Sequence, residues 1–71
     1  MRKTFGNNVR ILRIARNATQ AAIAQQCGIF RTYLSRIESG EANPSLTVIV
    51  ALAEALDVLP HELLNFQDSL D

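Results

Sequence analysis

The chain has 71 residues, 48% of them hydrophobic, with seven basic residues, seven acidic residues and a single cysteine. This length fits one small domain over residues 1–71, and a lone cysteine excludes an intramolecular disulfide and a cysteine-rich metal site. We expect neither a signal peptide nor a membrane span, because Arg10 and Arg13 interrupt the first apolar stretch and no apolar run reaches the roughly 18 residues that a span requires. A reducing, cytoplasmic location is therefore predicted.

The formal net charge of zero hides a strong asymmetry along the chain. All seven basic residues lie between positions 2 and 36, and all seven acidic residues lie between positions 38 and 71. Chance clustering in a short chain is the alternative, but no charged residue crosses the boundary. The pattern favours a basic half that faces a polyanion and an acidic half that is turned away from it.

Apolar periodicity predicts an all-α domain of five helices without a strand. We expect helices at residues 4–17, 20–27, 31–38, 46–56 and 60–65, followed by a C-terminal tail, 65–71. Thr19 and Ser45 can cap the second and fourth helices, Gly28 can end the second, and Pro60 can open the fifth.

The buried faces of the first and fourth helices can be predicted from residue spacing. In the first helix Phe5, Val9 and Leu12 share one face, whereas Ile11 and Ile14 point elsewhere. The fourth helix is expected to bury an apolar face that consists of Leu46, Ile49, Val50, Ala53 and Leu56.

The third helix, RTYLSRIE, has a polar face that is unusual for a mere solubilising surface. At about 100° per residue, Leu34 and Ile37 point one way. The opposite face presents Arg31, Thr32, Ser35 and Arg36, with no carboxylate facing the arginines. Such a face is suited to a polyanionic partner.

The segment from Thr19 to Val58, TQAAIAQQCGIFRTYLSRIESGEANPSLTVIVALAEALDV, resembles the helix-turn-helix of the lambda-repressor and Cro type, also called the xenobiotic-response-element family. The resemblance covers about residues 5–64, and the RTYLSRIE run is also similar to restriction–modification controller proteins. It implies a compact five-helix domain, prokaryotic or phage in origin, with its helix-turn-helix at the second and third helices. It also implies binding of double-stranded DNA by the third helix in the major groove. No enzymatic activity is expected, because no catalytic triad or glycine-rich phosphate loop can be assembled from the residues.

In this resemblance the base-reading positions are Arg31, Thr32, Ser35 and Arg36. Arginine can fork onto guanine, and threonine or serine can donate, accept or offer a methyl contact. Contacts to the DNA backbone are expected from Gln20, Tyr33, Asn43, Thr19 and Arg16.

Three further positions are singled out by the same resemblance. Arg13 and Glu38 occupy the positions of a buried structural ion pair, which would remove Arg13 from the charges that face DNA. Phe30 stands where the family usually has serine or threonine, so it cannot cap the third helix with its side chain. Its ring either packs on the domain surface or meets a thymine methyl group or a sugar.

The leading hypothesis is a sequence-specific transcription regulator that binds a near-palindromic operator as a homodimer. We expect the dimer interface at the fifth helix and tail, made of Leu59, Leu63, Leu64 and Phe66. The alternative is an antitoxin-like protein-interaction module that also binds DNA. No cofactor, metal, membrane or small-molecule ligand is expected, because neither a metal-ligand cluster nor a phosphate loop can be assembled from the sequence.

Overall fold

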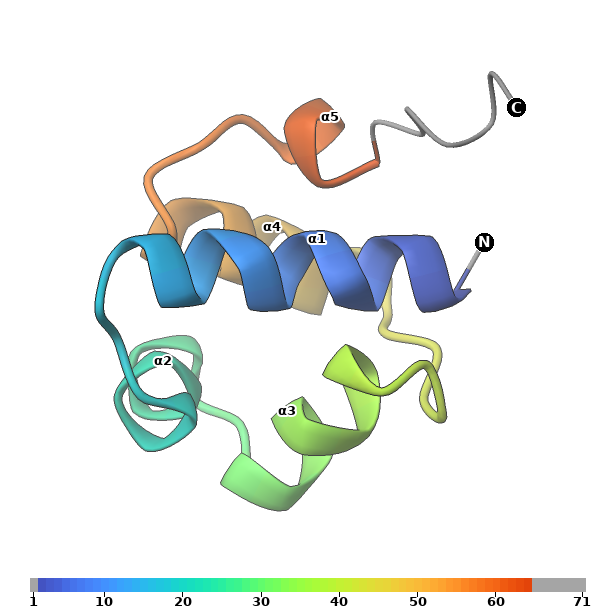
Figure 1. Cartoon of the computed structure of the whole chain (residues 1–71). Coiled ribbons are helices and arrows are strands. Elements are labelled where there is room, and N and C mark those ends of the chain that lie inside the picture. The colour runs from blue at the N-terminus through green and yellow to red at the C-terminus, as the bar shows by residue number, and fades with distance from the viewer. Residues whose placement is uncertain (1, 65–71) are drawn as a thin grey trace.

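The computed structural model describes residues 2–64, with their side chains from residue 4 onward. Its helices follow the order α1 (Arg2–Ala15), α2 (Gln20–Cys27), α3 (Arg31–Glu38), α4 (Leu46–Ala55) and α5 (Pro60–Leu63), and the described range contains no strand. The prediction of an all-α, five-helix domain is confirmed. α1 crosses the middle of the molecule, with α2 and α3 on one side of it and α5 on the other (Figure 1).

Left-handed residues decide where α1 and α4 end. α1 stops at Ala15, two residues before the predicted end, because Asn17 adopts a φ of 58° and the N–H of Ala18 bonds the carbonyl of Arg13. Asp57, also with a φ of 58°, ends α4 in the same manner. Asparagine and aspartate tolerate this conformation better than most residues.

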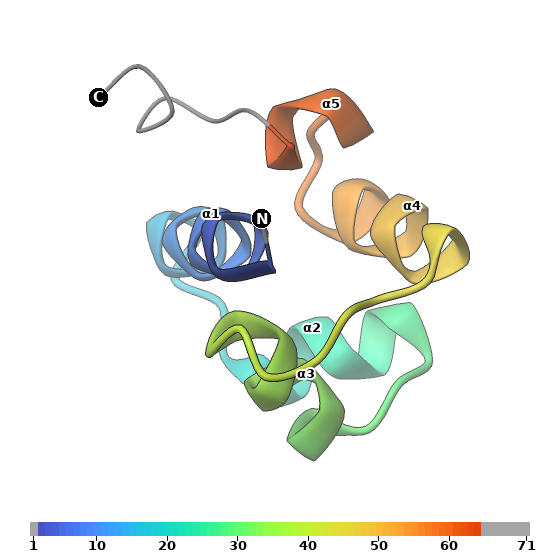
Figure 2. The same cartoon turned by 90° about the vertical axis from the view of Figure 1, so that its right-hand side faces the viewer.

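The hydrophobic core is contributed by all five helices. When viewed along α1, the helices surround a common centre (Figure 2). The side chains with less than 2% exposure and the largest volumes are Leu34, Ile37, Leu52, Leu56, Leu63 and Val9. Phe5 and Val9 of α1 are buried and Leu12 packs partly against them, as predicted.

The predicted buried face of α4 is wrong at two positions. Leu46 is 75% exposed and Val50 is 39% exposed, whereas Leu52, which was not predicted, is completely buried. The reason is that α4 contacts both α2 and α5, so its buried stripe is turned toward Leu52, Ala53 and Leu56. Leu46 and Val50, four residues apart, remain together on the outer face.

Leu63 belongs to the core, which contradicts its assignment to a dimer interface. Its exposure is 0%, because the short helix α5 folds back onto α1 and α4. The side-chain amide of Asn8 in α1 donates to the carbonyl oxygen of Leu63 at 2.9 Å and fastens the end of α5. Of the other predicted interface residues, Leu59 is exposed, Leu64 is half-buried and Phe66 lies outside the described residues.

Candidate nucleic-acid interface

α2 and α3 form a helix-turn-helix through well-defined local geometry. The hydroxyl of Thr19 accepts from the N–H of Ala22 at 3.0 Å and starts α2. Gly28 ends α2 with a φ of 71°, after which the N–H of Ile29 bonds the carbonyl of Ala24 at 3.0 Å. A Cβ at position 28 would touch nothing within 4 Å, so glycine is required there by conformation and not by space.

α3 separates a buried face from an exposed polar one. Leu34 and Ile37 are completely buried, and Tyr33 packs partly against the core. Arg31, Thr32 and Arg36 are exposed, and Ser35 is half-buried. The four residues predicted to read bases therefore lie on the outer side of α3, and no carboxylate of α3 is exposed beside them because Glu38 is buried.

The side chain of Glu38 is paired with Arg13, as expected. Nε of Arg13 donates to Oε2 at 2.7 Å and Nη2 donates to Oε1 at 3.0 Å, which makes the pair bidentate. Nη1 of Arg13 donates to the carbonyl of Ala18 at 2.9 Å, and the side-chain amide of Gln20 donates to Oε1 of Glu38 at 3.0 Å. This network ties the end of α1 and the start of α2 to the end of α3.

The predicted contacts to the DNA backbone occupy different surroundings. Thr19 and Asn43 are exposed, while Tyr33 and Gln20 are half-buried. One donor of the Gln20 amide is engaged with Glu38. The guanidinium of Arg16 donates to the carbonyl of Leu56 at 3.3 Å, so Arg16 interacts with the C-terminus of α4, where a positive charge is favourable.

The sequence profile of the helix-turn-helix domain matches residues 4–66, nearly the whole chain. The chain belongs to the helix-turn-helix family. Families of this kind comprise DNA-binding transcription regulators and are generally not enzymes.

Several members of the helix-turn-helix family are similar to this chain over most of their length. Control protein C.BamHI of Bacillus amyloliquefaciens is 42% identical over 93% of this chain and 83% of its own. The crystal structure of the restriction–modification controller protein C.AhdI from Aeromonas hydrophila is 41% identical, with a TM-score of 0.84 over 86% of this chain and 92% of the other. The hypothetical transcription factor NHTF from Neisseria has a TM-score of 0.88 at 33% identity, over 97% of this chain and 79% of the other. The resemblance to lambda-repressor and Cro-type proteins, and in particular to controller proteins, is thereby confirmed.

Among the described residues, Phe30 is the large apolar residue with the highest exposed fraction. It is the N-cap residue of α3, makes no side-chain capping bond, and is 83% exposed. The alternative in which its ring packs on the surface of its own domain is therefore wrong. The ring is accessible for the other alternative, a contact with a thymine methyl group or a sugar.

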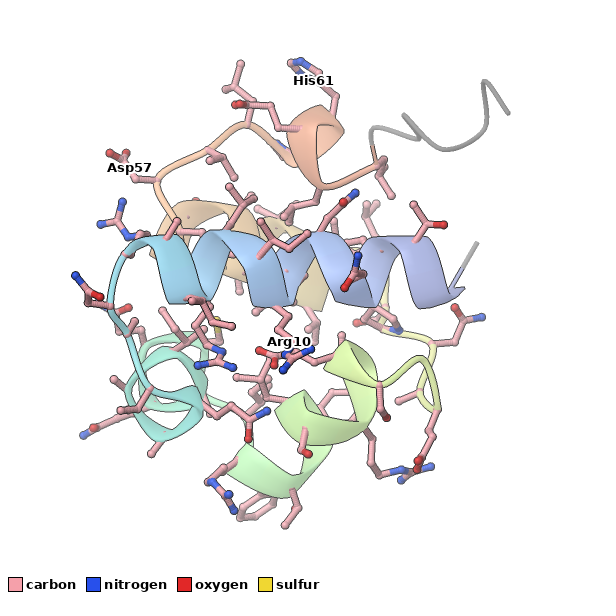
Figure 3. The ribbon with its side chains drawn as sticks, in the orientation of Figure 1. Arg10, Asp57 and His61 are labelled. Atoms are coloured by element: carbon pink, nitrogen blue, oxygen red, sulfur yellow. The ribbon has the colours of Figure 1, made fainter. Side chains whose placement is uncertain are left out.

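Arg10 was missed as a candidate by the sequence analysis. It is exposed and extends from α1 in the direction of α3 (Figure 3). The signal that could have identified it is its spacing of three from Arg13, because residues three apart share a helix face and Arg13 reaches Glu38 of α3. Asp57 and His61 lie on the opposite side of the molecule, at the α4–α5 connection and α5 (Figure 3).

The basic and acidic residues, which occupy separate halves of the sequence, are only partly separated in the folded domain. Arg13 and Glu38 neutralise each other, and Arg16 is directed to α4. Glu41 is exposed directly after α3, where its N–H bonds the carbonyl of Arg36 at 2.8 Å. Within the described residues the exposed cations near α3 are therefore Arg10, Arg31 and Arg36.

Burial raises the pKa of the half-buried Cys27 thiol above its ordinary value, which disfavours the reactive thiolate. Among residues 2–64, no helix is long and apolar enough to cross a membrane, and no three His, Cys, Asp or Glu residues gather as a metal site would require.

Proposed function

We propose that this helix-turn-helix protein is a sequence-specific transcription regulator that binds a near-palindromic operator in double-stranded DNA as a homodimer. The observation that carries the proposal is the outer face of α3, where Arg31, Thr32 and Arg36 are exposed while the Arg13–Glu38 pair and the core hold the opposite face in place. Controller proteins and transcription factors among its relatives support the same function.

The size of α3 fits the major groove. An α-helix with its side chains is about 10–12 Å in diameter, and the groove is about 12 Å wide. Arg31 and Arg36 can each donate two hydrogen bonds to O6 and N7 of a guanine, and Thr32 can bond a base edge or contact a thymine methyl group. Arg10 supplies a positive charge from α1 that can approach a phosphate beside the groove.

A single α3 can read only a short sequence, about four or five base pairs. Two copies related by a two-fold axis would read half-sites about 34 Å apart, on the same side of the duplex. A homodimer is therefore the arrangement that gives one short helix enough sequence information.

The outer face of α4 and the start of α5 are the surface that we assign to the dimer. Leu46 and Val50 share that face of α4, and Leu59, 60% exposed, precedes α5. These side chains lie on elements other than α3. Full burial of one such side chain contributes roughly 1.5–3 kcal/mol, and symmetry doubles each contribution, against an association cost of at least about 4 kcal/mol.

Selection of bound sites from random duplex DNA, followed by sedimentation of the complex, tests the proposal. We expect an enriched near-palindrome, two chains for each duplex and half-sites one helical turn apart. Failure to enrich any sequence would reject the proposal and favour the protein-interaction module. Enrichment of a single half-site with one bound chain would reject the homodimer and leave DNA binding standing.

A further inference from the structure

Phe30 has no structural role that accounts for its aromatic ring. It is 83% exposed, so it contributes little to the core, and it forms no capping bond, so it does little for the start of α3. Burial of an exposed phenyl ring against a partner is favourable, because it removes apolar surface from water. The ring immediately precedes Arg31 and Thr32, the first two exposed residues of the reading face.

The chemistry of the surroundings selects the kind of partner. A second copy of the chain docked on Phe30 through its own α3 would bring two Arg31 guanidinium groups together and desolvate them, with no exposed carboxylate on either α3 to pair with them. The major groove instead presents phosphates and base-edge acceptors to the arginines. It also offers one apolar group, the C5-methyl of thymine, for which phenylalanine is a suitable contact.

We infer that Phe30 is a specificity-determining residue that contacts the C5-methyl group of one pyrimidine in each half-site. The inference rests on the proposed function and refines it, because it adds an apolar element to the polar reading by Arg31, Thr32 and Arg36. In unmodified DNA the pyrimidine is thymine. The same methyl group occurs in 5-methylcytosine, so the ring would respond to methylation of a cytosine at that position.

The experiment uses the full chain and the duplex obtained by selection. Each thymine is replaced in turn by deoxyuridine, which removes only the methyl group, and the dissociation constant is measured at fixed salt. We expect one position per half-site where the replacement weakens binding by about fourfold, the fold-change that corresponds to the burial of one methyl group. Replacement in both half-sites should weaken binding by about fifteenfold.

The matched variant is Phe30→Ala, because alanine also lacks a capping side chain and leaves the start of α3 unchanged in that respect. This variant should bind the thymine and deoxyuridine duplexes with nearly equal affinity, whereas Phe30→Leu should keep most of the difference. In a duplex with cytosine at the same position, 5-methylation should strengthen binding by the wild type about fourfold and leave binding by Phe30→Ala unchanged.

Three results would overturn the inference while DNA binding stands. One is a selected duplex in which no thymine responds to deoxyuridine. Another is an equal response of the wild type and Phe30→Ala at every thymine. The third is a wild type that sediments as a dimer and a Phe30→Ala variant that sediments as a monomer. That result would show that the ring contacts the second subunit. If no duplex is selected at all, the proposed function itself fails.

Discussion

Gly6 of α1 lies directly against the carbonyl oxygen of Ile37 in α3. The Cβ of any other residue at position 6 would overlap that oxygen and would lie 3.0 Å from the carbonyl oxygen of Glu38. α1 and the end of α3 can therefore approach each other this closely only because a hydrogen atom replaces a side chain. The contact sets the position of α3 on the rest of the domain.

Gly6→Ala should consequently destabilise the protein despite the better helix propensity of alanine. In a free helix the change would stabilise by about 1 kcal/mol, whereas the overlap with backbone atoms should cost about 1–3 kcal/mol beyond that gain. Thermal unfolding followed by circular dichroism measures the difference. Asn7→Ala, at an exposed neighbouring position, is the control and should not lower the melting temperature. A Gly6→Ala variant as stable as the wild type would show that α1 and α3 can separate without loss.

Removal of one partner of the Arg13–Glu38 pair should lower the free energy of unfolding, mainly because the other charge stays buried without a partner. Both side chains are largely buried, with 12% and 4% exposure. Glu38→Ala strands the guanidinium of Arg13 and should cost about 3–5 kcal/mol of unfolding free energy. Denaturant unfolding gives this value, with Glu41→Ala as the exposed control. Arg13→Met combined with Glu38→Leu should recover much of the loss, and a double variant as unstable as Glu38→Ala would argue against stranded charge as the cause.

The salt dependence of DNA binding should report the three exposed arginines near α3. Arg10, Arg31 and Arg36 each bring one positive charge into the field of the phosphates, whether the side chain bonds a phosphate or a base edge. With three such charges per subunit and six per dimer, the logarithm of the association constant should fall with the logarithm of salt at a slope near −5. Arg10→Gln removes one charge from each subunit and should make the slope shallower by about 2. Arg16→Gln, whose guanidinium interacts with the carbonyl of Leu56, should leave it unchanged. If the two variants behaved in the reverse way, Arg16 would be the phosphate contact.

Base preference should depend on Arg31 and Arg36. If each arginine forms two hydrogen bonds with a guanine, its replacement by alanine should cost about 1–3 kcal/mol per half-site and relax the preference at one base pair. Asn43→Ala, in the exposed loop after α3, should instead weaken all sequences about equally. Repeating the duplex selection with each variant distinguishes the two patterns. An unaltered preferred site in both arginine variants would mean that α3 is not the reader.

The dimer should depend on α4 and not on the core of α5. Leu46→Ser together with Val50→Ser should leave a folded helical monomer with weak DNA affinity, since both side chains are exposed within one chain. Leu63→Ser should unfold the domain, because that side chain is completely buried and its loss costs about 2–5 kcal/mol or more. Sedimentation and circular dichroism separate loss of dimer from loss of fold. A double variant that remains dimeric would direct attention to Ile11 and Ile14, which are 55% and 51% exposed on α1.

The sequence by itself determined the helix-turn-helix, because its signals are local. Thr19 caps α2, Gly28 can adopt a positive φ, and the spacing of Leu34 and Ile37 leaves Arg31, Thr32 and Arg36 on the opposite face. The partnership of Arg13 with Glu38 was also predicted, from the family resemblance, because both positions belong to its pattern.

Tertiary packing decided what local spacing leaves ambiguous. Leu46 and Leu52 are equally apolar, and only the contacts of α4 with α2 and α5 determine that Leu52 is buried and Leu46 is exposed. Leu63 is in the core because α5 folds back onto α1, and Phe30 is exposed because no other element covers it among the described residues. A residue's burial depends on which elements meet around it, and neither its own hydrophobicity nor its helical period contains that information.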